Sequence, residues 1–181
     1  MKVTLASGSV EEGDPDSSAI PLSFFQYLGH ALSEFIPGLW EESVLYGEIE
    51  ISLKFVSPLE MRSLNVAYRG IDKPTDVLSF GLWEGGAFPD PKEWQILPLG
   101  DIVLCPEFIQ ENSRQAKLNL LEELCLMISH GLLHLLGWDH DTEEEEVLML
   151  EKQAFIASGL YSALPDPEKE RYLERSGGTR E

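Results

Sequence analysis

The strongest pattern along the chain is an alternation of polar and apolar side chains over residues 48–56. Every second position in this stretch is apolar, at Ile49, Ile51, Leu53 and Phe55. Successive side chains of a strand point to opposite faces of a sheet, so the alternation predicts a strand with one buried face. Weaker patterns predict an edge strand over 1–6 and two short strands over 76–80 and 101–104.

Two helices are predicted in the first half of the chain. Apolar residues at helical spacing favour a helix over 21–35, which the following Pro-Gly pair should end. Ser57, Pro58 and Glu60 then have the N-cap, N1 and N3 arrangement of a helix start. This second helix should run to about residue 68.

The second half of the chain is mainly helical in pattern. One helix should begin at Pro106, and another should run over about 119–136, almost wholly apolar after Glu123. Gly137 stands where a helix stop is expected. The last pattern predicts an amphipathic helix over about 142–157 with an acidic first turn, which the helix dipole favours.

These elements do not alternate strictly, so they predict an α+β domain in which a small mixed sheet of about four strands packs against five or six helices. Residues 7–20 are rich in Gly, Ser and acidic side chains and should form a loop, and 81–98 should form an ordered loop or hairpin excursion. We expect a single domain over 1–164, followed by a charged, flexible tail over 165–181.

Composition narrows the class of protein. The chain has 181 residues, 43% of them hydrophobic, which is normal for one globular domain. No apolar run reaches the ~20 residues of a membrane span, and the N-terminus lacks the apolar core of a signal peptide. We therefore expect a cytoplasmic protein with no membrane partner, in which Cys105 and Cys125 are free thiols.

The formal net charge of −19 argues against nonspecific binding to nucleic acids. The charge is uneven along the chain. Between Lys54 and Lys117, seven basic residues stand against nine acidic ones, a net charge of −2, so the rest of the chain carries −17. A polyanion would have to approach through this middle segment.

Three of the four histidines lie within the sequence HGLLHLLGWDH, at His130, His134 and His140. Histidines four apart on a helix project from one face, so the first two can reach one ion. A glycine at 137 can turn the chain and bring the third imidazole to the same ion at the end of a central helix. Three neutral imidazoles leave a coordination position for water, which is typical of a catalytic metal site. We assign no role to His30.

Two neighbours of the histidines refine this prediction. Position 131 is glycine, so the glutamate that acts as general base in the HExxH motif of zinc proteases is missing. Asp139 has a functional interpretation, in which it orients a ligand imidazole or accepts a proton from metal-bound water, and a structural one, in which it is only a turn residue at the helix end. From the residues alone both interpretations of Asp139 stay open.

A second patch, LNVAYRGIDKPTDVLSF, covers residues 64–80. It places several groups that can bind phosphate between a helix and a strand: Arg69, Asp72, Lys73, Thr75 and Asp76. The planar guanidinium of Arg69 suits a phosphodiester. An ordinary solvated turn is the alternative interpretation, because loops are commonly charged.

These two segments, with LGDIVLCPE (residues 99–107) between them, resemble the YbeY family of metal-dependent endoribonucleases, also called rRNA maturation factors. The resemblance covers about 44–160, and Trp138 replaces the tyrosine usual in the family. It implies one zinc ion held by His130, His134 and His140, although another divalent transition metal could also suit three histidines. It further implies that Arg69 is the family's functional arginine, and that a small mixed sheet packs against helices.

The resemblance also implies cleavage of single-stranded RNA, in 16S rRNA 3′-end maturation and ribosome quality control. The expected partners are rRNA and ribosomal proteins or the small ribosomal subunit, with no DNA. We expect metal-assisted hydrolysis in which Arg69 holds the phosphate, or attack by the RNA 2′-hydroxyl. The alternative is a non-catalytic ribosome-assembly factor that uses its acidic surface, and a zinc protease is disfavoured by Gly131.

Overall fold

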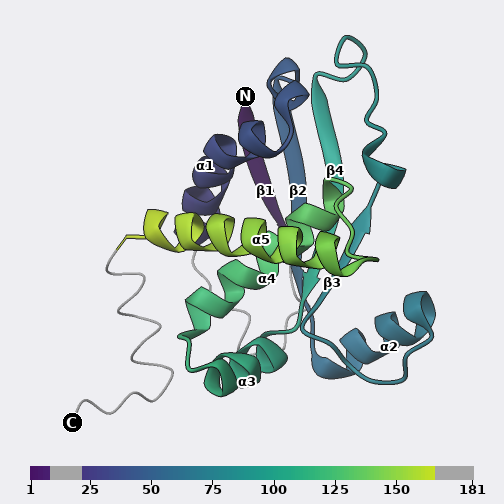
Figure 1. Cartoon of the computed structure of the whole chain (residues 1–181), viewed down its shortest axis with the longest axis vertical. Helices are drawn as coiled ribbons and strands as arrows, with labels where there is room; N and C mark the ends of the chain where they lie inside the picture. Colours follow the sequence, from purple (N-terminus) through teal and green to yellow (C-terminus); the bar gives the residue numbers. More distant parts are fainter. Residues whose placement is uncertain (9–21, 166–181) are drawn as a thin grey trace.

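Four strands form one sheet in the computed structural model, which describes residues 1–8 and 22–165. The strands are β1 (Lys2–Gly8), β2 (Glu48–Phe55), β3 (Val77–Gly81) and β4 (Ile96–Leu104). Their order in the sheet is β1-β2-β4-β3, as Figure 1 shows. β1, β2 and β4 are parallel, and β3 is antiparallel to β4. Most of the predicted 7–20 loop, and the tail beyond residue 165, lie outside the described residues.

Five α-helices surround the sheet: α1 (Leu22–Leu39), α2 (Pro58–Arg69), α3 (Pro106–Ala116), α4 (Leu120–Leu135) and α5 (Glu143–Ala163). Short 3-10 helices η2 (Glu41–Leu45) and η3 (Glu84–Gly86) lie in the connections. This architecture confirms the predicted α+β fold with a small mixed sheet. None of the helices in the described part is long and apolar enough to cross a membrane.

The alternation predicted for β2 is confirmed, because its four alternate apolar residues are all buried. β4 is the main correction among the strands, since it is nine residues long and not four. A Pro and a Gly within Ile96–Leu104 disfavour a strand in the sequence. In the structure they flank a bulge: Glu50 pairs with Pro98 and Ile51 with Gly100, which leaves Leu99 as the extra residue. Gly100 has φ 141°, and a Cβ there would lie 2.1 Å from the Phe80 carbonyl oxygen.

Two helices are longer than predicted. α1 continues through Pro37 to Leu39, because the lost hydrogen bond falls in the last turn and Ile36 is fully buried there. α5 extends six residues beyond the predicted end, because Leu160 is also fully buried. α5 is less amphipathic than predicted: it buries one stripe but also exposes Val147 and Phe155, which are 58% and 69% accessible.

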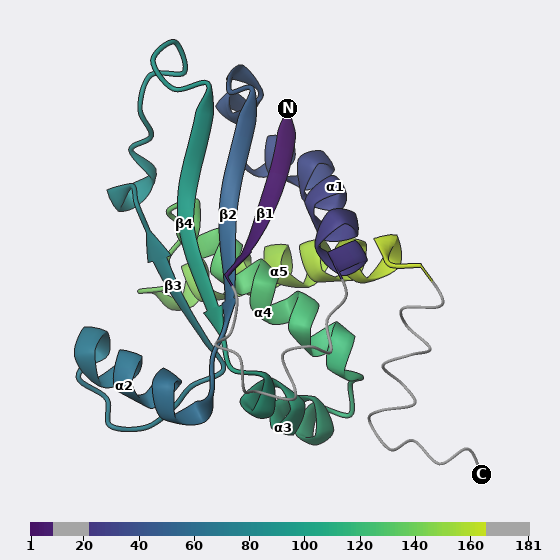
Figure 2. The same cartoon turned by 180° about the vertical axis from the view of Figure 1, so that it is seen from behind.

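The helices cover the two faces of the sheet unequally. α1, α4 and α5 lie over one face and enclose the main core, whereas the view from behind shows the other face largely free of helices (Figures 1 and 2). α2 contributes Met61 to a small second cluster with Leu78 and Val103 at one end of that face. The open part is polar and includes an ion pair between Lys54 and Asp101 at 2.8 Å. This arrangement directs α4 past β3 and β4 and carries its C-terminal end to the β3 side.

Candidate metal centre

The candidate site is built on α4, whose sequence fixes both its ends. Asn119 and Glu122 form a capping box: the Asn119 side chain accepts from the Glu122 amide at 2.9 Å, and Glu122 accepts from the Asn119 amide at 2.8 Å. The apolar side chains that follow bury the helix against the sheet and α5. The two histidines of this helix therefore come at its last two turns, on a rigid and buried element.

The structure brings the three predicted histidines together. His130 and His134 project from α4 and His140 from the loop that follows, and one ring nitrogen of each lies within 4.8 Å of the others. The Nε2 atoms of His130 and His134 are 3.1 Å apart. His140 is exposed, whereas the other two are partly buried. This group can hold a metal ion, and the position beyond it faces solvent on the His140 side.

Hydrogen bonds on the far side of two rings determine which nitrogen carries the proton. The Nδ1 atom of His130 is 3.1 Å from the side-chain oxygen of Gln153, and Nδ1 of His134 is 3.1 Å from the backbone carbonyl of Trp138. Both oxygens only accept, so each Nδ1 must be the donor in the neutral ring. Each Nε2 then has a lone pair free for a metal, the arrangement common among histidine ligands.

The fit to a metal follows from this protonation. Two Nε2 lone pairs that face each other at 3.1 Å form no hydrogen bond and repel each other. A metal ion at ~2.0–2.1 Å from each nitrogen would satisfy both at this separation. The donor set of three imidazoles suits a divalent transition metal.

Burial also favours the neutral, metal-binding form of the two helical histidines. Burial lowers the pKa of the His130 ring below its ordinary value, and the charges of His140 and Arg69 lower it further. The pKa of His134 is lowered in the same way, by burial and then by the charges of His130 and His140. Protons therefore compete weakly with a metal for these two rings at neutral pH.

The turn after α4 depends on Gly137. Its φ of 85° is left-handed, as predicted for the helix stop, and a Cβ there would lie 2.7 Å from the Gly86 backbone nitrogen. The connection between β3 and β4 thus packs against this turn. Asp139 lies beyond it, and its Oδ1 accepts a hydrogen bond from the His140 amide at 2.9 Å. This contact fits the turn interpretation of Asp139, while its charge also favours the protonated form of His134.

The presence of glycine at position 131 has a structural explanation that the sequence alone does not reveal. A Cβ at this position would lie 2.8 Å from Cγ2 of Ile102, a fully buried residue of β4. α4 therefore approaches the sheet so closely that only glycine fits. A glutamate at 131, as in the HExxH motif, would be directed into the core and could not serve as a base at the histidines.

Arg69 is the last residue of α2. It is exposed, and no ion-pair partner of its side chain occurs in the described part of the chain. Its charge contributes, as the smallest of the named causes, to the lowered pKa of His130. Gly70 follows with φ 69° and terminates the helix.

The other members of the predicted phosphate patch are engaged differently. Asp72 forms two hydrogen bonds with Arg62, at 2.7 and 2.8 Å, so this carboxylate and guanidinium are paired with each other. Asp76 accepts from Thr75 at 3.0 Å and from the Asn112 side chain at 2.8 Å. Lys73 is exposed, and its carbonyl accepts from the Asn65 side chain at 2.7 Å. Arg69 is thus a cation of this patch without an ion-pair partner among the described residues, and its charge acts on His130.

Sequence reasoning missed Gln153, which holds the ring of His130. Gln153 is only 7% exposed and lies on α5 in a stripe with the buried residues Met149, Ile156 and Leu160. A polar residue in an apolar helical stripe was the available signal. Glu123 gives the same signal on α4: it is 6% exposed, and burial and the charge of Asp76 raise its pKa.

Comparisons with known proteins agree with this geometry. Residues 26–161 match the family described as Endoribonuclease YbeY. An Endoribonuclease YbeY of Thermoanaerobacter sp. (strain X514) is 38% identical over 139 residues, covering 74% of this chain and 87% of the relative. Another, of Halalkalibacterium halodurans, is 44% identical over 118 residues, covering 64% and 74%.

A solved structure supports the fold. The solution structure of a Thermotoga maritima protein matches with a TM-score of 0.59 and 24% identity, covering 98% of this chain and 99% of that one. This likeness supports the α+β architecture alone. The family match extends from α1 to α5 and contains all three histidines, Arg69 and Gly131. The chain therefore belongs to the YbeY endoribonuclease family.

Proposed function

We propose that this protein is a zinc-dependent, single-strand-specific endoribonuclease that acts in rRNA processing. We include maturation of the 16S rRNA 3′ end and ribosome quality control in this role. The observation that carries the proposal is the convergence of three imidazoles, two of which have their outer nitrogens held by hydrogen bonds. An arginine without an ion-pair partner among the described residues, Arg69, adds a charge that reaches His130. A nuclease needs such a pair of features, one to support hydrolysis and one to hold a phosphate.

In this proposal His130, His134 and His140 hold the metal. A zinc ion in such a site supplies Lewis acidity and lowers the pKa of bound water toward ~7. Gln153 and the Trp138 carbonyl keep the first two rings in the correct tautomer and orientation. The chain's own contribution is thus a preorganised set of neutral nitrogen donors.

Arg69 binds and orients the scissile phosphate. A guanidinium can donate two parallel hydrogen bonds to a phosphodiester and offset negative charge that develops on it. Asp139 is the proposed proton acceptor: one of its oxygens is held by the His140 amide, and Oδ2 has no hydrogen-bond partner among the described residues. Its carboxylate is therefore fixed at one oxygen and open at the other.

The test is cleavage of a short, end-labelled single-stranded RNA by the full chain. Cleavage should stop when the metal is removed, return when zinc is added, and be absent from the His130→Ala variant. A matched duplex RNA should be cut much more slowly. Cleavage that persists without bound metal, or in a metal-free His130→Ala protein, would refute the assignment.

The nucleophile can be determined from the same reaction. Attack by water leaves a 5′-phosphate or a 3′-phosphate without a cyclic form, whereas attack by the 2′-hydroxyl leaves a 2′,3′-cyclic phosphate. Mass spectrometry of the product termini distinguishes the two routes. A substrate with one 2′-deoxy residue at the cleavage position gives an independent check, because only the second route requires the hydroxyl.

A non-catalytic role in ribosome assembly is the second candidate, and the net charge of −19 favours it. An acidic surface gains more from a basic ribosomal protein than from bare RNA. In that case the metal would stabilise the fold, and purified zinc-loaded protein would bind small-subunit proteins without cutting RNA.

The close approach of Gly131 to Ile102 disfavours a zinc protease, and a casein assay should give no hydrolysis.

A further inference from the structure

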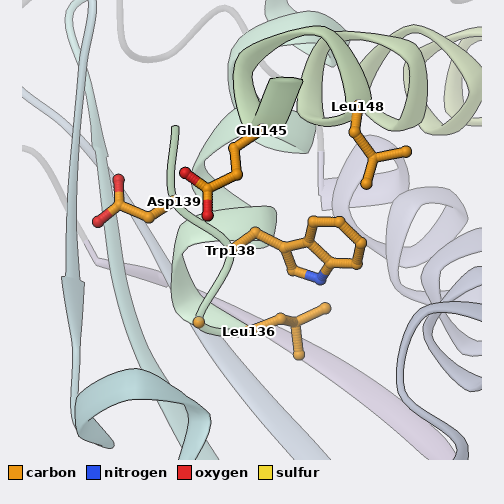
Figure 3. Close-up of a pocket in the computed structure, with 6 residues that line it drawn as sticks. Leu136, Trp138, Asp139, Glu145 and Leu148 are labelled. Carbon is orange, nitrogen blue, oxygen red and sulfur yellow. The ribbon is translucent and has the colours of Figure 1, made fainter. Parts of the chain in front are cut away.

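A hollow of about 250 Å³ lies beside the histidine group, between the end of α4 and the first turns of α5. It is lined by Leu136, Gly137, Trp138, Asp139, Glu145 and Leu148. Figure 3 shows the indole of Trp138 between Leu136 and Leu148, with the Glu145 carboxylate near the start of the Trp138 side chain and the Asp139 carboxylate directed away from the indole. Its volume is at the lower end for ligand pockets, so it suits one flat group and not a whole drug-sized molecule.

Two residues that line the hollow, Trp138 and Asp139, also contact histidines of the candidate metal centre. The carbonyl of Trp138 accepts the hydrogen bond from His134, and Asp139 precedes His140. A group seated against the indole therefore lies next to residues that contact two of the three histidines. Asp139 and Glu145 add two carboxylates to the otherwise apolar lining of the hollow.

Both carboxylates of the hollow are held at one oxygen and open at the other. Oε2 of Glu145 accepts from the Thr142 amide at 3.0 Å and from its hydroxyl at 2.9 Å, in the capping box of α5. Oδ1 of Asp139 accepts from the His140 amide at 2.9 Å. Their second oxygens have no hydrogen-bond partner among the described residues. The hollow thus presents fixed acceptors.

The indole adds a donor and a flat apolar surface. Within the described ranges the N–H of Trp138 has no hydrogen-bond partner. The ammonium of Lys152 lies 4.9 Å from the ring centroid and offsets part of the acidic charge. Two carboxylates repel a phosphate, so the part of an RNA chain that enters here is the neutral base and not the backbone.

We propose that this hollow is a nucleobase subsite that selects bases carrying an exocyclic amino group. The inference rests on the proposed ribonuclease function and specifies which nucleotide that site accepts. The base packs on Trp138, and its amino group donates to the open oxygen of Glu145. Adenine, cytosine and guanine each carry an exocyclic amino group that can donate in this way, whereas uracil has only carbonyl oxygens as exocyclic groups and is disfavoured.

Binding of nucleoside 5′-monophosphates to the full chain tests the subsite without any need for cleavage. AMP, CMP and GMP are titrated against UMP while tryptophan fluorescence is followed, and the Trp138→Phe variant identifies the contribution of this indole. We expect the three amino-bearing nucleotides to bind about five- to tenfold more tightly than UMP. Equal binding of all four, or no quenching that depends on Trp138 at millimolar concentrations, would overturn the proposal.

Two variants of neighbouring residues make the test specific. Glu145→Gln keeps an oxygen for the Thr142 cap but replaces an acceptor in the hollow by an amide that can donate, so the preference over UMP should shrink or reverse. Glu144→Gln removes the same charge from the same helix turn at a residue that does not line the hollow, and it should retain the preference. Identical behaviour of the two variants would contradict a role for Glu145.

Failure of the subsite and failure of the proposed function give different results. If the protein cuts no RNA but binds nucleotides with the expected preference, the ribonuclease proposal fails and the subsite remains. If it cuts RNA at all four bases equally, in both the unmodified protein and Glu145→Gln, the subsite fails and the ribonuclease proposal remains.

Discussion

Two helix ends carry the residues proposed for the site, and each helix is followed by a glycine with a left-handed backbone, in different surroundings. α2 ends at Gly70 with φ 69°, and α4 ends before Gly137 with φ 85°. A Cβ at Gly70 would meet nothing within 4 Å, whereas a Cβ at Gly137 would lie 2.7 Å from a backbone nitrogen. One end is open and presents Arg69, and the other is packed and presents the histidines.

The difference shows how a site can combine rigidity with access. The nitrogens of His130 and His134 that face away from the cluster are fixed by Gln153 and the Trp138 carbonyl, so the lone pairs are aimed before any ligand arrives. Arg69 has no such contact among the described residues, so in the proposed function its side chain can follow a flexible RNA backbone. Replacing the Arg69 side chain at the open end should change activity without changing stability, and replacing Gly137 at the packed end should lower stability more than replacing Gly70.

The largest effect is expected at the open end. Arg69→Ala should lower the rate of RNA cleavage by about 10²–10³-fold, because charge on the phosphate loses its stabilising donor. Metal content and thermal unfolding should stay unchanged, since the side chain is exposed. Arg62→Ala is the matched control: it lies on the same helix but is paired with Asp72, and its loss should have little effect on cleavage. Equal losses in the two variants would show that Arg69 acts only as a general surface charge.

The two glycines should differ in stability. Gly70→Ala should cost about 1 kcal/mol, which is the penalty of a left-handed backbone alone. Gly137→Ala should cost about 2–4 kcal/mol, because the new Cβ also collides with the backbone of Gly86. Denaturant unfolding of both variants measures the difference. An equal loss of unfolding free energy in the two variants would show that the connection between β3 and β4 moves to accept the new Cβ, and that the end of α4 is not rigidly packed.

Substitution of Gln153 should change the affinity for the metal more than it changes the stability of the packing between α4 and α5. Gln153→Leu removes the acceptor for His130 Nδ1, and we expect metal affinity to fall about 10–100-fold. Gln153→Glu restores an acceptor and should recover most of that affinity. Competition with a chromogenic chelator measures both values. Unchanged affinity in Gln153→Leu would mean that the imidazole is oriented by its packing alone.

A smaller effect is expected from pH. Burial lowers the pKa of His130 and His134 in the folded chain, so the unfolded chain binds protons more readily. The free energy of unfolding of the metal-free protein should therefore be highest above the unfolded pKa of ~6.5 and fall as the pH drops through the lowered folded values. His134→Asn should flatten this dependence in chemical denaturation. A stability that increases on acidification over the same range would contradict the buried, neutral state of the two rings.

Much of the site could be predicted because it depends on local spacing. The i, i+4 histidines, the glycine stop and the N-cap at Ser57 are local signals, and their backbone consequences are seen in α4, Gly137 and α2. The fold class followed from the order of elements. Residues that depend on tertiary contact were not predicted, notably Gln153, which reaches His130 across 23 positions in the sequence.

The errors in element boundaries have the same origin. Pro98 and Gly100 disfavour a strand locally, but pairing with β2 and burial of Leu97 and Leu99 extend β4 around a bulge. Position 159 lies inside α5, where glycine is normally unfavourable. It is a glycine because a Cβ there would be 2.0 Å from the Phe35 ring. The sequence contains the glycine, but only the structure shows the ring that requires it.

The most direct test of the account is the metal content of the purified full chain, measured by elemental mass spectrometry beside its RNA cleavage. We predict about one zinc ion per chain, lost together with cleavage in His134→Ala and retained in His30→Ala, a histidine outside the cluster. Chelation should abolish cleavage in the unmodified protein, and added zinc should restore it. A protein that holds no metal and still cuts RNA, or one whose metal survives in His134→Ala, would contradict the central claim.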